Sequence, residues 1–332
     1  MGERQPVQSV QRNVLSFDET SLLPQRELLV PEHGVWVEAP RAEHAPAITD
    51  LYRQAYDRSD FFAGRYTDPE SEIFDPDWLS DDFNNPEHKW FAFTGNDGQV
   101  LGVTGFFHDY NIDGSPIITS DETQIAPAGR GKRTMDHFFR LVVPRIEAAG
   151  DLLATSFVLT PETKGLRRTL QTELGMFSLG ILPHVLKHRV SGVTRSEIVS
   201  AKFNDFRPQP VSIHADFEPL YNIVKSQVPE LPEPEVLPAE QIDQPLPGDS
   251  LTDSFEESPF PASGADPKQQ KYLLQAGFKP VAYYPRLNSF TMAKFPKSMP
   301  ELGFLIENES IQANTDLVRY LEEELYNRKE RR

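Results

Sequence analysis

The chain has 332 residues and a mass of 37.7 kDa, which leaves room for about two domains. Its 33 basic and 50 acidic residues give a net charge of −17, which argues against a nucleic-acid or anionic-membrane partner, because phosphate contacts need a basic face. The absence of cysteine excludes disulfides, zinc–thiolate sites, iron–sulfur clusters and thiol nucleophiles. Since no run approaches the roughly 18 apolar residues of a membrane helix, and the polar start lacks a signal peptide's apolar stretch, we expect a soluble cytoplasmic protein.

Composition changes most sharply between Pro229 and Pro267, a stretch with nine prolines, ten acidic residues and no Lys or Arg. Such a sequence buries little apolar surface and repels itself, which predicts an extended linker or a long solvated loop, with partner docking as the alternative. The predicted organisation is an N-terminal arm (1–33), a folded domain (34–206), a helix with the acidic linker (207–267) and a C-terminal unit (268–332).

From residue 35 onward, hydrophobic patterns predict alternating strands and helices. The predicted strands are 35–38, 90–94, 100–107, 116–125, 152–159, 177–182 and 197–203. One helix begins near Pro46, a second covers 135–146 but should kink or end early at Pro144, and a third covers 163–174 and ends at Gly175. This order predicts an α/β fold with a mixed central β-sheet and helices on both faces.

The segment from Ile125 to Met135 lies between a strand end and a helix start, where unpaired backbone N–H groups and the helix dipole favour an anion. Gly129 and Gly131 would let the backbone approach a ligand closely, and three cationic side chains surround them: Arg130, Lys132 and Arg133. The alternative is an ordinary strand-to-helix turn with basic surface residues.

On these residues the sequence resembles the GCN5-related N-acetyltransferase (GNAT) family over residues 35–203. The resemblance rests on the order of elements, on Ile125-x-Pro127-x-x-Arg130-Gly131-Lys132, and on a helix ending in Leu174-Gly175-Met176 before a strand. It implies the acyl-CoA N-acyltransferase fold, with acetyl-CoA or another acyl-CoA bound by Thr123, Ile125, Arg130, Gly131, Lys132, Arg133, Thr134 and Met135. The family carries glycine or another small residue at positions 133 and 135, so Arg133 and Met135 depart from its pattern.

Transfer of an acyl group to an amine requires a base, because a protonated amine has no lone pair to offer. The resemblance points to Glu122 as the base, and strict strand alternation would place Gln124 on the same face, with Asp121 and Thr123 on the other. A carboxylate at a solvated strand end is the alternative for Glu122. In the family a tyrosine four residues before the helix-ending glycine protonates the thiolate; that position is Gln171, which cannot act as an acid.

The acceptor is expected to bind near an aromatic stretch that follows the first helix and includes Phe61 and Phe62, with Gln124 orienting it. An aromatic wall rimmed by carboxylates suits a cationic amine, whereas the alternative is a core-facing cluster (with Tyr66, Phe74 and Trp78) beside a solvated acidic loop. The acidic residues lack the spacing of an EF-hand, so no metal site is predicted.

The C-terminal unit is predicted to be a partial repeat of the acyltransferase fold. Ala276-Gly277-Phe278 followed by Pro285 echoes Leu174-Gly175-Met176 followed by Pro183, and the chain ends in an amphipathic helix from Thr315 to about Arg328. Three roles stay open for this unit: covering the acceptor groove, completing the sheet, or forming a homodimer.

The resulting hypothesis is a cytoplasmic N-acyltransferase that transfers an acetyl group from acetyl-CoA to a small-molecule or peptide amine by direct attack in a ternary complex, with no nucleic-acid or membrane partner. The alternatives are a non-catalytic binding or regulatory protein of the same fold with a degenerate loop, and a sugar- or nucleotide-binding α/β module.

Overall fold

The computed structural model describes most of the chain from residue 26 onward. The described residues are 26–57, 62–63, 72–85, 88–110, 116–149, 152–158, 164–188, 194–202, 208–242, 262–264, 266–285, 288–293 and 311–326. No helix among them is long and apolar enough to cross a membrane.

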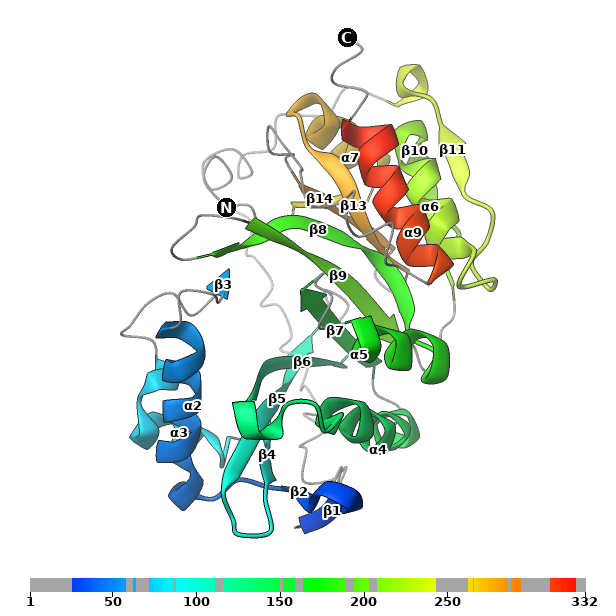
Figure 1. Cartoon of the computed structure of the whole chain (residues 1–332). Helices are drawn as coiled ribbons and strands as arrows, with labels where there is room; N and C mark the ends of the chain where they lie inside the picture. Colours follow the sequence, from blue (N-terminus) through cyan, green and yellow to red (C-terminus); the bar gives the residue numbers. More distant parts are fainter. Residues whose placement is uncertain are drawn as a thin grey trace, which may run out of the picture.

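One twelve-stranded sheet runs through the molecule, with strand order β1-β2-β4-β5-β6-β7-β9-β8-β13-β14-β12 and a short β3 paired to β8 (Figure 1). The strands are β1 (Arg26–Val30), β2 (Val35–Glu38), β3 (Phe62–Ala63), β4 (His88–Thr94), β5 (Val100–Tyr110), β6 (Pro116–Ile125), β7 (Leu152–Val158), β8 (Phe177–His188), β9 (Thr194–Lys202), β12 (Ala262–Gly264), β13 (Lys279–Tyr284) and β14 (Ser289–Ala293). Alternating burial on β4 shows that both faces of the sheet are covered: Phe91 and Phe93 pack into one apolar core, Trp90 and Ala92 into another.

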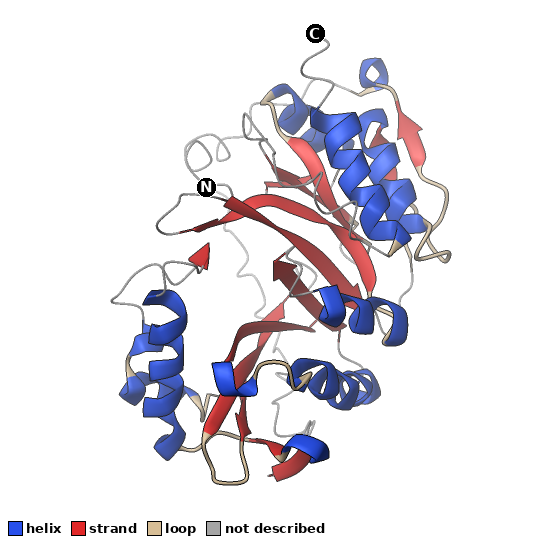
Figure 2. Cartoon of the chain, in the orientation of Figure 1, coloured by secondary structure: helices blue, strands red, loops and turns tan. Residues whose placement is uncertain are grey.

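Helices cover these two faces separately (Figure 2). The core that contains Trp90 lies under α2 (Ala45–Asp57) and α3 (Pro76–Asp82). The core that contains Phe91 lies under α4 (Thr134–Ala149) and the helix formed by α5 (Lys164–Arg168) and a π-helical turn at Thr169–Glu173. The predicted mixed sheet with helices on both faces is therefore confirmed.

The parallel pair β6–β7 sits in the middle of the sheet and separates before either strand ends. Their register runs from Ile117 opposite Leu152 to Ser120 opposite Thr155, whereas β6 continues to Ile125 and β7 to Val158. On the side that faces β7, the backbone of β6 after Ser120 therefore has no paired strand among the described residues.

The C-terminal segment extends the same sheet. β13 pairs with β8 through Ala282 and Gly180, and a third core joins β8 and β9 to β13, β14, α6 (Glu218–Lys225) and α9 (Gln312–Arg319). α6 and the red α9 lie side by side over these strands in Figure 1. Of the three predicted roles, completing the sheet is the one that the structure shows. α7 (Pro267–Gln275), β13 and β14 follow the same helix–strand–strand order as α5, β8 and β9, but that the segment is a repeat stays a prediction.

Several elements differ from the sequence predictions. α4 runs through Pro144 to Ala149. Its own residues Val142, Val143 and Ile146 are buried, and this packing outweighs the loss of the hydrogen bond that proline removes. The N-terminal arm ends in β1 and a 3-10 turn (Pro31–His33) instead of an unpatterned segment. The final helix begins at Gln312, three residues earlier than predicted, and continues as a π-helical turn at Tyr320–Tyr326.

The first part of the predicted acidic linker is folded. β10 (Ser212–His214) and β11 (Glu235–Leu237) form a small parallel sheet, and Leu231 and Ile242 are buried. Its apolar residues, spaced between the prolines, find cover against the third core, so this part is not a solvated spacer. Residues 243–261 lie outside the described part of the chain.

Candidate functional site

The loop between β6 and α4 has a backbone shaped for close approach. A 3-10 turn (Pro127–Gly129) leaves the strand; Gly131 follows with φ +75° and Arg133 with φ +54°. Only a few per cent of non-glycine residues adopt positive φ, at a cost of about 1–2 kcal/mol. Position 133, where the family pattern has glycine, thus keeps a left-handed backbone although an arginine stands there.

The amides of this loop point to an anion site. Arg130 N–H is bonded to the carbonyls of Ala126 (3.2 Å) and Pro127 (3.3 Å), and His137 N–H to that of Arg133 (3.1 Å). Between them, the N–H groups from Gly131 to Asp136 have no acceptor among the described residues. Consecutive unpaired amides at the start of a sixteen-residue helix combine hydrogen-bond donors with the positive end of the dipole. These amides are available to an anion, but every helix start leaves N–H groups free, so they do not by themselves distinguish a ligand site from an ordinary strand-to-helix turn with basic surface residues.

The three cationic side chains of this loop differ in their contacts and exposure. The Arg130 Nε donates to the carbonyl oxygen of Ile125 at 3.3 Å, while its head remains exposed. Lys132 is half-buried and has no ion-pair partner in the described part of the chain. Arg133 turns back onto Asp136, with Nε and a terminal nitrogen each 2.8 Å from the Asp136 Oδ2.

Two further loop residues are turned toward the protein. Met135 packs against the core beneath α4. Thr134, the first residue of α4, is 4 % exposed, and its buried hydroxyl has no hydrogen-bond partner among the described residues. Because a buried hydroxyl without a partner costs about 1–3 kcal/mol, Thr134 Oγ1 is the kind of atom that a bound ligand or water satisfies.

Glu122, the predicted base, lies at an irregularity of β6. Asp121 pairs with Gly105 and Gln124 with Val103, so two residues of β6, positions 122 and 123, face Thr104 alone. The prediction that Glu122 and Gln124 share a face assumed strict alternation along β6, and this β-bulge interrupts that alternation. Gly105 and Val103, which are two residues apart on β5, lie opposite positions 121 and 124 of β6, not 122 and 124. Bulges of this kind re-aim side chains, and the side chain of Glu122 lies outside the described residues.

The neighbours of the bulge are well defined. The Thr104 and Thr123 hydroxyls are 2.7 Å apart, which fixes Thr123 on the face covered by α4, together with Phe106 two residues beyond Thr104. Gln124 is opposite Val103, a residue of the core under α2, and therefore lies on the other face. The predicted cofactor residue Thr123 and the predicted acceptor residue Gln124 are thus on opposite faces of the sheet.

Gln171, at the position of the family's tyrosine, is tied into a buried polar network. It lies in the π-helical turn after α5, and its amide nitrogen donates to Ser178 Oγ (2.7 Å) and Ser200 Oγ (3.1 Å). Its oxygen accepts from the Asn314 amide of α9 (2.8 Å), and Ser178 Oγ donates to Asn314 Oδ1 (2.5 Å). Sequence reasoning identified Gln171 as a departure but missed Asn314, since no local pattern links residues 143 positions apart.

The predicted acceptor region is only partly described. Phe61 lies outside the described residues, and for Phe62 only the backbone is given, which pairs with His188 at the far end of β8. Phe74 and Trp78 pack against the core under α2, in agreement with the core-facing alternative. Asp75 caps α3 through the amide of Asp77 (2.9 Å).

A second group of acidic and aromatic residues has a structural role. Asp82 is buried and accepts hydrogen bonds from the Trp90 Nε1 (2.8 Å) and the Asn85 amide (2.9 Å), and it pairs with His88 Nδ1 (2.8 Å). These contacts hold the end of α3 against β4. In the part of the chain that the structure describes, no three His, Asp or Glu residues are grouped as a metal site would require.

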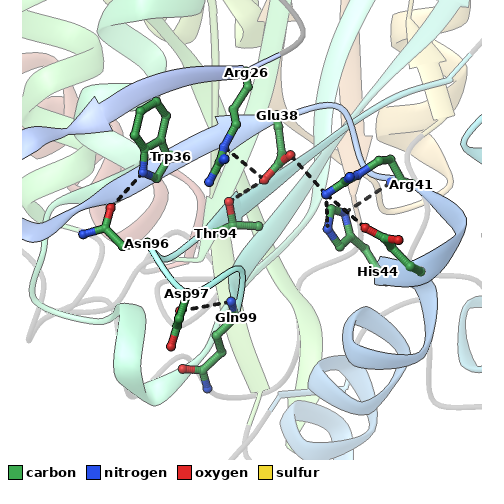
Figure 3. Close-up of polar contacts among 10 residues, drawn as sticks. Arg26, Trp36, Glu38, Arg41, His44, Thr94, Asn96, Asp97 and Gln99 are labelled. Atoms are coloured by element: carbon green, nitrogen blue, oxygen red, sulfur yellow. Dashed lines mark hydrogen bonds and ion pairs between the residues drawn. The ribbon is translucent and has the colours of Figure 1, made fainter.

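A buried carboxylate anchors the start of α2 (Figure 3). Glu38, at the end of β2, accepts from the Thr94 hydroxyl at 2.5 Å and lies 3.7 Å from guanidinium nitrogens of both Arg26 and Arg41. His44 is bonded through Nδ1 to the Arg41 amide (3.2 Å), and burial lowers its pKa. This cluster fixes the angle at which α2 crosses the face of β5 and β6, where the sequence predicts the acceptor.

Comparisons with known proteins bear on the fold. No protein-family model matches the sequence, and a search of curated proteins found no match. Among solved structures, the ribosomal-protein-S5-alanine acetyltransferase from Vibrio fischeri is 13 % identical with a TM-score of 0.42 and covers 52 % of this chain and 94 % of its own. A GCN5-related N-acetyltransferase from Kribbella flavida is 20 % identical (TM-score 0.41; 52 % and 98 % covered). A GNAT-superfamily phosphinothricin acetyltransferase from Sinorhizobium meliloti, in complex with AcCoA, is 16 % identical (TM-score 0.43; 53 % and 94 % covered). Each of these three structures matches about half of this chain and nearly all of its own length.

Proposed function

We propose that the protein is an acyl-CoA-dependent N-acyltransferase that uses acetyl-CoA and transfers the acetyl group to an amine. The observation that carries this proposal is the run of amides from Gly131 to Asp136 that have no acceptor among the described residues. They lie in the loop that follows β6, and β6 itself has no ladder partner on the β7 side after Ser120 in the described part of the chain. A pyrophosphate needs several donors converging from a positive helix end, and an extended pantetheine arm needs a free strand edge. Both features adjoin at the end of β6.

The backbone of β6 supports the arm-binding part of this proposal. Ala126 N–H points toward β5, where it is bonded to the Leu101 carbonyl at 2.9 Å. Because backbone groups alternate along a strand, the N–H of Ile125 faces the side of β7. The carbonyl oxygen of Ile125 accepts from the Arg130 Nε at 3.3 Å, and Thr123 belongs to the bulge, where this alternation is interrupted. An acyl-CoA amide could pair there as an added strand, and the same amides would stabilise the oxyanion of the tetrahedral intermediate.

The proposed reaction needs a base to accept the proton of the amine, but it can proceed without an acid at position 171 to protonate the thiolate. Glu122, at the bulge, would accept the proton of the amine directly or through one water. Gln171 cannot protonate the departing thiolate, and its amide is already committed to Ser178, Ser200 and Asn314. A thiol has a reference pKa near 8.5, so the thiolate is a tolerable leaving group without protein assistance.

Calorimetry with CoA tests the site. We expect micromolar binding that the double charge reversal Arg130→Glu and Lys132→Glu abolishes, because the reversal places two negative charges beside the pyrophosphate. The matched control is Arg140→Glu with Lys268→Glu, which changes net charge equally at α4 and α7, away from the loop. Absence of binding at millimolar CoA would remove the enzyme hypothesis.

The base is tested separately by rate measurements. Glu122→Gln should leave CoA affinity intact and lower turnover most near neutral pH, where the amine needs help to lose its proton. Release of free thiol with a panel of amines, polyamines, aminoglycosides, amino acids and peptides measures turnover and finds the acceptor. An unchanged pH–rate profile would eliminate Glu122 as the base.

A second candidate function is a non-catalytic binding or regulatory protein of the same fold with a degenerate CoA loop. The observation that favours it is the link between Gln171 and Asn314, which commits the usual acid position to structure. CoA binding without thiol release from acetyl-CoA, across the whole amine panel, would support this function over the enzyme.

A further inference from the structure

Arg133 has both a left-handed backbone and an ion pair with a buried carboxylate. We propose that Arg133 is a positioning residue that acts through Asp136, neutralising its carboxylate so that the rest of the loop presents net positive charge to a diphosphate. This inference rests on the proposed function and adds to it, because it explains why the chain has arginine where a glycine would suit the backbone better.

The geometry of the pair is specific. Arg133 Nε and a terminal nitrogen both lie 2.8 Å from one oxygen, Oδ2, of Asp136. The Asp136 side chain is 10 % exposed, whereas that of Arg133 is 64 % exposed. The carboxylate is thus held inside, at the third residue of α4, and the guanidinium closes over it from the solvent side.

Asp136 is a difficult neighbour for an anion. A carboxylate in the first turn stabilises a free helix by about 0.3–1 kcal/mol, because it complements the positive end of the dipole. The same carboxylate repels an anion bound at the neighbouring amides, and partial burial weakens the screening by water and salt. Neutralisation by Arg133 removes this conflict and keeps the contribution of Asp136 to the helix.

Local charge shows the size of the effect. Residues 130–136 carry three cationic side chains and one carboxylate, which leaves two net positive charges, equal to the negative charges of a diphosphate diester. Without Arg133, the largely buried Asp136 carboxylate would oppose one of these charges, whereas the charge of the exposed Arg133 guanidinium is itself well screened by water and salt. The buried hydroxyl of Thr134, which has no partner within the described part of the chain, is an independent sign that this stretch is completed by a ligand.

Two simpler roles for Arg133 predict different results. If its only effect were backbone strain, Arg133→Gly would restore the family pattern and tighten CoA binding. If its guanidinium contacted phosphate directly, its removal would weaken binding equally whether or not position 136 is charged. In our proposal the effect of Arg133 exists only while Asp136 is ionised.

A double-mutant cycle on the full chain, read by calorimetry with CoA, tests the proposal. We expect Arg133→Gly to weaken binding about tenfold, Asp136→Asn to tighten it or leave it unchanged, and the double variant to match Asp136→Asn within about twofold. Arg133→Lys should stay within about threefold of the unmodified protein. The matched control is Arg140→Gln, which removes a cation of the same helix that pairs with Glu173, and it should leave CoA affinity unchanged.

The outcomes separate this inference from the proposed function. If the unmodified protein does not bind CoA, both fail. If it binds CoA and Arg133→Gly binds as tightly or more tightly, only the inference fails. It also fails if the loss caused by Arg133→Gly is the same in the Asp136→Asn background. Thermal unfolding of each variant shows whether α4 has remained folded, and Asp136→Asn by itself tests the predicted repulsion should Arg133→Gly not fold.

Discussion

Asn314 is the residue through which the C-terminal helix holds the helix that precedes β8, and Asn314→Ala measures that link. The side chain is 1 % exposed; it donates to Gln171 Oε1 at 2.8 Å and accepts from Ser178 Oγ at 2.5 Å. Alanine would leave the partly buried Gln171 oxygen without this donor and force the buried Ser178 hydroxyl to another acceptor. At about 1–3 kcal/mol for each of these two groups, we expect the free energy of unfolding to fall by about 2–6 kcal/mol.

Urea unfolding followed by circular dichroism provides the assay, with the slope on denaturant checked to be unchanged. The control is Gln312→Ala on the same helix, because Gln312 is exposed and its amide contacts Asp316 alone among the described side chains; its effect should stay within about 0.5 kcal/mol. If Asn314→Ala also cost less than about 0.5 kcal/mol, the network would not be a stabilising link, and the interpretation of Gln171 as a structural replacement would be wrong.

Three further predictions concern packing and pH. Gly180→Ala should destabilise the protein by several kcal/mol in the same urea assay, because the added Cβ would lie 2.2 Å from a carbonyl oxygen of β13 where the two halves of the sheet join. Pro144→Ala should raise the melting temperature by stabilising the protein by about 1–3 kcal/mol, since Pro144 is exposed inside α4 and alanine restores an N–H donor; a lower melting temperature would show that the proline is needed. Burial raises the pKa of Tyr221 to about 12 and that of Tyr283 further, while burial lowers the pKa of His44. Above about pH 10 the two phenols ionise in the unfolded chain before they do in the folded protein, and below about pH 6.5 the His44 imidazole is protonated in the unfolded chain first. Stability should therefore fall both above about pH 10 and below about pH 6.5. Unfolding curves that do not change above about pH 10 would contradict the burial of the two tyrosines.

Much of the fold could be predicted from sequence wherever a local pattern settles the structure. β6 has the predicted ends, Pro116 and Ile125, because a β-rich stretch bounded by turn residues has few other conformations. Gly175 ends its helix with φ +69°, as the glycine suggested. Pro144 was misread, because local propensity cannot anticipate how much apolar surface a helix buries.

The loop after β6 shows the same division within the candidate site. Its place between a strand and a helix, and its three cations, were readable from residue order alone. The left-handed backbone at Arg133, the ion pair with Asp136 and the free amides were not, since each depends on how the helix sets against the sheet. The bulge at position 122 arose from the pairing of β5 with β6, which no single strand encodes.

By itself, the sequence determined what short-range chemistry determines: the order of strands and helices, the anion-favouring turn and the lack of a tyrosine at position 171. Only the tertiary structure decided that β13 joins β8, that Asn314 meets Gln171, and that β6 and β7 part before their ends. Those features bring together residues far apart in the chain, and their stability comes from burial and complementary hydrogen bonds, which a local pattern does not contain.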